Sequence, residues 1–294
     1  MSLPVHLGVN EDELLMFSKN SVASDAEIDA THLNAISKCL VGARLDARPL
    51  NGFPGELPDS LDNAYSIQSL SIRAWPDEIS GWKVGGVPQD FQEKFDAKHL
   101  SGPIFRAATQ SVGKDETISM PVFRGGFAAI EAEFIAQFAT NVGPGEIDQS
   151  AVSLLDIVST VYIGAETAGS PMADINRLGP VAIISDFGNN AGLVIGPEVK
   201  GWRDRLAQKI TVEVDVDGER VGTVAVAMKD GVLAAVRFLI ELCTARGIHI
   251  PAGTLVSCGA LSGIHDVKVG AESWVHFEGL GSFGVQFTER QPVV

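Results

Sequence analysis

The chain is short of basic residues and of cysteine. Its 294 residues include 22 Lys and Arg against 37 Asp and Glu, which gives a formal net charge of −15. A surface of that sign repels the phosphates of nucleic acids and the headgroups of anionic lipids, so we expect neither a nucleic-acid nor a membrane partner. The three cysteines, Cys39, Cys243 and Cys258, form no CxxC pair. The sequence therefore predicts neither a disulfide scaffold nor a structural zinc site.

Long apolar runs are missing as well. No stretch reaches the roughly 18 residues that a membrane-spanning helix needs, and the acidic start MSLPVHLGVNEDELL lacks the basic segment and the apolar run of a signal peptide. We therefore expect a cytoplasmic protein. The strand–GxGxxG–helix pattern of dinucleotide sites is also missing. No Ser-His-Asp arrangement can be read either, and His265 fits an ordinary polar loop as well as it fits a catalytic base.

The first quarter of the chain carries helical patterns. Apolar side chains recur at helical spacing over residues 27–44, and a second apolar stripe follows Asp59 and Ser60. Either of these two residues can cap a helix, because its side-chain oxygen accepts a hydrogen bond from a free backbone N–H. We therefore predict a helical N-terminal cap over residues 1–76.

The rest of the chain is dominated by short β-prone runs broken by Gly and Pro. Residues 211–226 alternate Val with acids and turn at Asp217-Gly218, which predicts a hairpin. One clear amphipathic helix interrupts the strands over residues 230–247. The composition, 45% hydrophobic and 20% charged, is that of a globular protein with a sizeable core. We predict an α+β protein in which residues 77–294 form the β-rich catalytic domain.

Two glutamates interrupt an otherwise apolar segment, GGFAAIEAEFIAQFAT, at residues 125–140. In a strand, Glu131 and Glu133 point to the same side about 7 Å apart. That arrangement suits a hard divalent cation, which prefers oxygen ligands. A solvated strand face explains the same alternation, as it does for Glu213 and Asp215 beside the hairpin. The Glu-x-Glu pair by itself leaves both interpretations open.

The isolation of the acids favours the metal interpretation. Arg124 is the only other charged residue between residues 117 and 145, and Glu166 is the only one between residues 156 and 174. A buried ionised carboxylate must be paired, protonated or bound to metal, because burial without a partner is costly. Taken singly, Glu166 also fits a lone acid at a turn, and Lys83 in GWKVGG also fits a solvent-facing strand lysine.

The order of the motifs resembles the 2-keto-4-pentenoate hydratase and 2-oxo-3-enedioate decarboxylase family of the fumarylacetoacetate hydrolase superfamily. The matching segments are LDNAYSIQ (61–68), GWKVGG (81–86), SGPIF (101–105), IEAEF (130–134), IGAETAGSP (163–171), LGPVAIISDFGNNAGLVIGPEV (178–199), SCGALSG (257–263) and VHFEGLGSFGVQF (275–287). The resemblance covers most of the chain. It implies a mixed β-roll body that bears the site, with a helical N-terminal region.

The resemblance also implies the residues of the site. It implies a bound Mg²⁺ or Mn²⁺, and an active-site lysine that contacts the substrate or moves a proton. The implied metal ligands are Glu131, Glu133 and Glu166. The implied catalytic residue is Lys83, and the implied substrate-binding residues are Lys83, Asn189, Asn190 and Ser262. Two positions depart from the pattern: Ser101 stands where many relatives carry an acid, and Ala260 where several carry Ser or Thr.

The implied activity is that of a lyase acting on a small anionic 2-oxo acid. A hydratase of this family adds water to a 2-hydroxy-2,4-dienoate and yields a 4-hydroxy-2-oxo acid, in the breakdown of aromatic compounds. Relatives commonly assemble as homo-oligomers. The same site suits a 2-oxo-3-enedioate decarboxylase or an acylpyruvate-type C–C hydrolase, although no His-Glu dyad for the hydrolase is evident. A non-catalytic binding protein that kept the fold is a further alternative.

Overall fold

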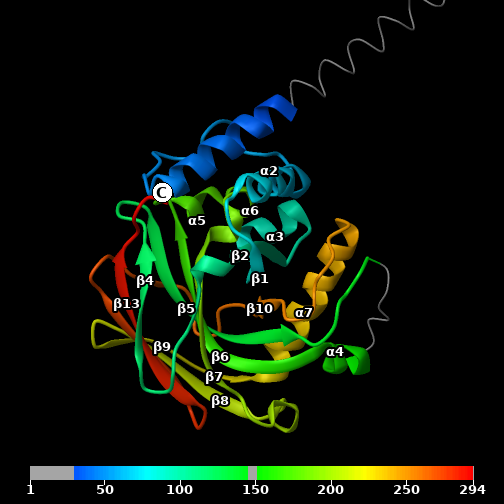
Figure 1. The fold of residues 1–294 in the computed structure, drawn as a ribbon, viewed down its shortest axis with the longest axis vertical. Coiled ribbons are helices and arrows are strands. Elements are labelled where there is room, and N and C mark those ends of the chain that lie inside the picture. Colours follow the sequence, from blue (N-terminus) through cyan, green and yellow to red (C-terminus); the bar gives the residue numbers. More distant parts are fainter. Residues whose placement is uncertain (1–29, 145–150, 294) are drawn as a thin grey trace, which may run out of the picture.

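Two curved β-sheets and a group of helices make up the chain, which a computed structural model describes over residues 30–144 and 151–293 (Figure 1). The larger sheet has the spatial order β2 (His99–Phe105), β1 (Ile79–Gly86), β10 (Leu255–Ser257), β5 (Phe127–Phe138), β6 (Val158–Ser170), β7 (Asn190–Glu198) and β3 (Thr109–Ser111), with the short β11 (His265–Asp266) also paired to β5. The smaller sheet has the order β4 (Thr117–Val122), β13 (Gly281–Glu289), β12 (Glu272–Phe277), β8 (Lys209–Val216) and β9 (Glu219–Ala227). Apolar side chains from both sheets and from α7 (Met228–Ala245) form one buried core.

The strands that matter most for function are β5 and β6. They pair antiparallel over nearly their whole length, and both are buried along most of it. A strand covered on both faces reads as a continuous apolar run, which is why residues 125–140 look like core. The smaller sheet shows the other pattern. Its β8–β9 hairpin alternates buried and exposed residues and turns at Asp217 and Gly218, both at positive φ, as the sequence predicts.

Helices gather on one end of the molecule. A helical segment at residues 30–45 packs with α2 (Leu61–Ala74), α3 (Gln89–Phe95), α5 (Ile175–Leu178) and α6 (Pro180–Ser185) in the upper part of Figure 1, whereas α4 (Ala151–Ile157) lies by α7. Ser60 caps α2 by accepting from the backbone N–H of Asn63 at 3.3 Å. The α+β class and the helical N-terminal region are thus confirmed.

Beyond residue 76 the sequence analysis identified only the helix at residues 230–247, and the structure adds α3, α4, α5 and α6. Every residue of α6 is buried, so it has no polar face to produce a helical period. In α3, Phe91 and Phe95 pack partly buried against the helical core, but seven residues are too few to give a clear helical period. The N-terminal helices share a buried core with residues 172–184, and the boundary at residue 76 stays a prediction. Among the described helices, none has the length and apolar character of a membrane-crossing segment.

Candidate active site

Three glutamates meet at the centre of the larger sheet. Glu131 on β5 stands directly opposite Glu166 on β6, and Glu133 follows two residues along β5 on the same face. Their carboxylates each offer an oxygen, and these oxygens all lie within 4.8 Å of one another. Glu131 is 5% exposed, and Glu133 and Glu166 are fully buried. The interpretation of the pair as a solvated strand face is therefore wrong, and so is that of Glu166 as an acid at a turn.

Lys83 reaches the same cluster from β1. Its Nζ lies 3.4 Å from Oε2 of Glu166, and its side chain is 6% exposed, so the solvent-facing interpretation is wrong. The side chain runs past Gly188, which has a φ of +67°. A Cβ on Gly188 would lie 3.1 Å from Cδ of Lys83 and 2.8 Å from the backbone of Gly102. The glycine thus leaves the space that the lysine occupies.

Neighbouring polar groups hold two of the carboxylates. Oε2 of Glu133 accepts hydrogen bonds from the hydroxyl of Ser257 and from the backbone N–H of Gly259, the latter at 2.9 Å. Oε1 of Glu166 accepts from Nδ2 of Asn190 at 3.0 Å. The sequence analysis missed Ser257 and Gly259 as site residues, although both lie in the quoted SCGALSG segment.

The other oxygen of each of these two carboxylates accepts no hydrogen bond, although Nζ of Lys83 lies 3.4 Å from that of Glu166. Oε1 of Glu133 and Oε2 of Glu166 are buried and accept no hydrogen bond among the described residues. Leaving such oxygens unsatisfied is costly. One Mg²⁺, Mn²⁺ or Ca²⁺ binds carboxylate oxygens at about 2.0–2.6 Å, so a single ion can join oxygens separated by the distances seen here. The donor set therefore fits a hard divalent cation.

The charges of the cluster depend on one another. Burial raises the pKa of Glu131 to about 7, with Lys83 opposing that shift and Glu166 adding to it. Burial and the two neighbouring carboxylates raise the pKa of Glu133. Burial alone would lower the pKa of Lys83, but the three carboxylates outweigh it and the net direction is upward. In this state Lys83 is an ammonium group, and it offsets part of the acidic charge.

A cavity of about 590 Å³ opens onto the cluster. Lys83 and Glu131 lie in its lining, and Asn189, His99 and Asp230 add polar groups. Its apolar walls include Val84, Leu100, Ile183, Ala235, Leu261 and Ile264. The cavity is large enough for a small organic acid, and it combines the charged groups of Lys83 and Glu131 with apolar walls.

The chain was compared with known protein families and with characterised proteins. No family model matches the chain. Over 259 residues, 86% of this chain and 96% of the relative, it is 27% identical to 4-oxalocrotonate decarboxylase of Pseudomonas putida. Over 262 residues, 87% of this chain and 94% of the relative, it is 26% identical to 2-keto-4-pentenoate hydratase of Paraburkholderia xenovorans strain LB400. The chain is thus similar, over nearly its whole length, to members of this hydratase and decarboxylase family. The predictions of the family and of a hydratase-like lyase are thereby confirmed.

Solved structures agree on the fold. The 4-oxalocrotonate decarboxylase of Pseudomonas putida G7, complexed with magnesium and adipate, superposes with a TM-score of 0.70 over 87% of this chain and 97% of that one, at 21% identity. Fumarylpyruvate hydrolase of Pseudomonas aeruginosa, in complex with Mn²⁺ and pyruvate, gives a TM-score of 0.52 over 71% and 89%, at 16% identity. The predicted β-roll fold is thus confirmed.

The other substrate-binding residues that the family resemblance implied, Asn189, Asn190 and Ser262, lie in three different surroundings. Asn189 lines the cavity, and its Oδ1 is buried without a hydrogen-bond partner. The amide of Asn190 is instead engaged with Glu166. Ser262 is not among the cavity residues, and its hydroxyl lies 3.1 Å from Nε2 of His265. The structure therefore brings Asn189 to the cavity, puts Asn190 behind a carboxylate and leaves Ser262 aside.

The two departures from the family pattern also have distinct places. Ser101 is fully buried on β2, and its hydroxyl donates to the backbone oxygen of Lys83 at 2.7 Å. It supports the strand that carries the lysine. Ala260 lines the cavity and is exposed there. Cys258 also borders the cavity, but burial and the neighbouring Glu133 raise the pKa of its thiol, which argues against a thiolate nucleophile.

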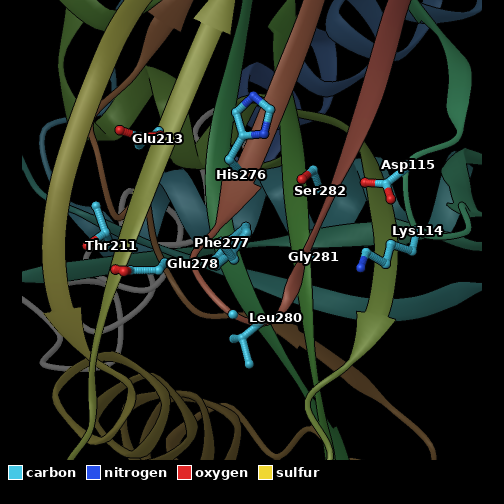
Figure 2. A pocket seen from close by; sticks show the side chains of 11 residues that line it. Lys114, Asp115, Thr211, Glu213, His276, Phe277, Glu278, Leu280, Gly281 and Ser282 are labelled. Carbon is cyan, nitrogen blue, oxygen red and sulfur yellow. The ribbon is translucent and has the colours of Figure 1, made fainter.

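A different hollow, of about 670 Å³, lies on the smaller sheet and is shown in Figure 2. Its charged side chains carry both signs, among them Lys114, Asp115 and Glu278, and all three are exposed. None of the three clustered glutamates borders it. We assign the chemistry to the cavity at Lys83 and Glu131, because the buried, mutually perturbed charges lie there.

Proposed function

We propose that the chain is a metal-dependent hydratase that adds water to a 2-hydroxy-2,4-dienoate and yields a 4-hydroxy-2-oxo acid. The observation that carries this proposal is the asymmetry of the cavity. Lys83 and Glu131, from a cluster of one buried lysine and three carboxylates, border the cavity, and most of the remaining lining is apolar. Such a cavity suits a monocarboxylate whose 2-oxo-acid end faces the charges and whose far end is uncharged.

The metal ligands in this proposal are Glu131, Glu133 and Glu166, and the ion is Mg²⁺ or Mn²⁺. When bound, it would supply Lewis-acid stabilisation to an enolate and would offset much of the negative charge that raises the pKa of Lys83. The oxygens that accept no hydrogen bond, on Glu133 and Glu166, support this assignment. Ser257, Gly259 and Asn190 orient the carboxylates through their second oxygens.

Lys83 and Asn189 have separate tasks in the proposed reaction. The Lys83 ammonium sits at the charged end of the cavity, where it fixes the substrate carboxylate or gives a proton to the carbon skeleton during ketonisation. Oδ1 of Asn189 is a buried acceptor without a partner at the cavity wall. It can accept a hydrogen bond from the attacking water or from the new hydroxyl group. Ser262 is left without a direct role in this arrangement.

Decarboxylation of a 2-oxo-3-enedioate is the second candidate, and the 27% identity to a decarboxylase supports it. That substrate carries a second carboxylate at its far end. Apart from Lys83, the cavity residues include only one side chain that can become cationic, His99, and Asp230 would repel the carboxylate. The lining therefore favours the hydratase. For the acylpyruvate-type hydrolase, the described cavity residues offer no His-Glu dyad.

The test compares two substrates under one set of conditions. Purified protein is stripped with EDTA and assayed with 2-hydroxypenta-2,4-dienoate and with 2-oxo-3-hexenedioate, before and after Mg²⁺ or Mn²⁺ is restored. We expect loss of the dienoate absorbance only with metal, little CO₂ from the enedioate, and a fall in kcat of at least about a hundredfold in Lys83→Met. Faster CO₂ release than hydration would favour the decarboxylase. Full activity after verified metal removal would refute both.

A cytosolic location, a place in the breakdown of aromatic compounds and assembly as a homo-oligomer remain predictions that accompany this function. Each follows from the composition or from the family resemblance, and each can be checked on the purified protein or in the cell of origin.

A further inference from the structure

A second cavity of about 250 Å³ shares no lining residue with the active-site cavity, although Asn190 in its lining also donates to Glu166. Two arginines, Arg44 and Arg290, border it. Phe105, Phe187 and Trp75 supply an aromatic wall, and their rings lie 5.0 to 5.5 Å from one another. The net charge of −15 predicts a mainly acidic surface, so a hollow lined by two arginines and aromatic rings differs from it in the sign of its charge.

The charge of Arg44 is already neutralised. Its Nε lies 2.5 Å from Oδ1 of Asp186, and its Nη2 lies 3.0 Å from Oδ2 of the same carboxylate. Asp186 also accepts from the hydroxyl of Ser170 at 2.6 Å. This carboxylate is thus engaged with Arg44 and Ser170, and it forms no ion pair with Arg290.

Arg290 has no such acid. Its Nη2 donates to the backbone oxygen of Ala191 at 2.9 Å, and its guanidinium lies 4.9 Å from the centre of the Phe123 ring. Its Nε is buried without a hydrogen-bond partner, and the described residues give it no ion pair. Burial, together with the charge of Arg44, lowers the pKa of Arg290 to about 10. A cation placed in this way is stabilised by an anion that enters the cavity.

Asp77, the one acidic residue in the lining, does not supply that anion. Its Oδ2 accepts from the backbone N–H of Ala107 at 2.8 Å, and its Oδ1 accepts from that of Glu78 at 2.8 Å. A carboxylate is the anion that matches a planar guanidinium, since two parallel N–H groups can bind its two oxygens. The aromatic wall then suits an apolar or aromatic tail.

We propose that this second cavity binds a small organic carboxylate with an apolar or aromatic tail, with Arg290 as its anchor. The site differs in kind from the active site, because it needs no metal ion. Benzoate is a suitable probe, and Trp75 in the lining provides a fluorescence signal.

The test titrates benzoate into the metal-free full chain and follows both heat and tryptophan fluorescence. We expect saturable binding of one benzoate per chain, and a weakening of at least about tenfold in Arg290→Met. Arg290→Lys, which keeps the charge and loses the fork, should weaken binding by a smaller factor. Arg106→Met is the matched control, because Arg106 is exposed, paired with Glu78 and outside the lining. Circular dichroism verifies the fold of each variant.

One more variant separates this site from the active site. Lys83→Met should leave benzoate binding unchanged, and loss of binding there would assign the benzoate to the active site and overturn the proposal. The proposal would fail equally if folded Arg290→Met bound benzoate as the parent does, or if the folded parent showed no saturable binding up to tens of millimolar.

Discussion

Glu131 makes the stability of the metal-free protein depend on pH. Burial raises its pKa from 4.5 in the unfolded chain to about 7 in the folded one. The folded state therefore holds the proton more tightly, and the stabilisation from this group is complete below about pH 4.5 and is lost as the pH rises through about 7. Glu131→Gln keeps the shape of the side chain and removes this titration.

The size of the effect follows from the two pKa values. The difference of about 2.5 units corresponds to on the order of 3 kcal/mol in the free energy of unfolding, at about 1.4 kcal/mol per unit. For a protein of this length, roughly 2–4 °C of melting temperature accompany each kcal/mol, so the expected shift is about 6–12 °C. Lys83 keeps its contact with Glu166 in the variant, so the substitution leaves no unpaired buried cation.

Urea and thermal unfolding in EDTA, at about pH 5 and about pH 8, measure this difference. We expect Glu131→Gln to be more stable than the parent at the higher pH and to approach it at the lower pH. Glu241→Gln, at an exposed acid on α7, is the matched control and should track the parent. Added Mg²⁺ should raise the melting temperature of the parent at the higher pH far more than that of Glu131→Gln. A variant that is less stable than the metal-free parent at the higher pH would refute the reasoning.

Two further predictions concern the surroundings of the cluster. Ser257→Ala should weaken Mg²⁺ affinity by roughly 10- to 100-fold in isothermal titration, because Glu133 loses a hydroxyl donor. Ser262→Ala is the control and should leave the affinity unchanged, because the hydroxyl of Ser262 lies beside His265. Equal losses of affinity in the two variants would contradict the assignment. Gly188→Ala should lower the free energy of unfolding, measured in urea, by about 1–3 kcal/mol more than Gly247→Ala does. Both glycines have positive φ, but only Gly188 lies close to Lys83 and Gly102. Equal losses of stability in the two variants would show that the space beside Lys83 is not needed.

The sequence predicts the clustered glutamates better than it predicts the residues that donate hydrogen bonds to them. Glu131 and Glu133 stand out because a charged residue in an apolar strand is conspicuous along the chain itself. Ser257 and Gly259 carry no comparable signal, since Ser and Gly are ordinary in any loop. They reach Glu133 only because β10 lies between β1 and β5, a pairing that joins segments more than a hundred residues apart. Sequence spacing cannot reveal that register.

The same limit explains why the sequence analysis did not identify α6 and why it could not separate the roles of Asn189 and Asn190. The helix α6 is buried on all sides, so its residues have no hydrophobic period. The GNNAG segment indicates a turn, but two adjacent asparagines alternate in direction, and only the fold decides which one faces the cavity. The structure turns Asn189 to the cavity and Asn190 to Glu166.

Buried polar atoms without partners connect the two proposed sites. Most buried polar atoms in a folded protein have a partner, so those that do not are informative. Here they include two carboxylate oxygens, on Glu133 and Glu166, and one guanidinium nitrogen, Nε of Arg290. The three clustered carboxylates share one cation, Lys83, whereas Arg290 has no acidic partner among the described residues. The same reasoning therefore assigns a further cation to one cavity and a carboxylate to the other. Each assignment stands on its own local charge, so the failure of one leaves the other intact.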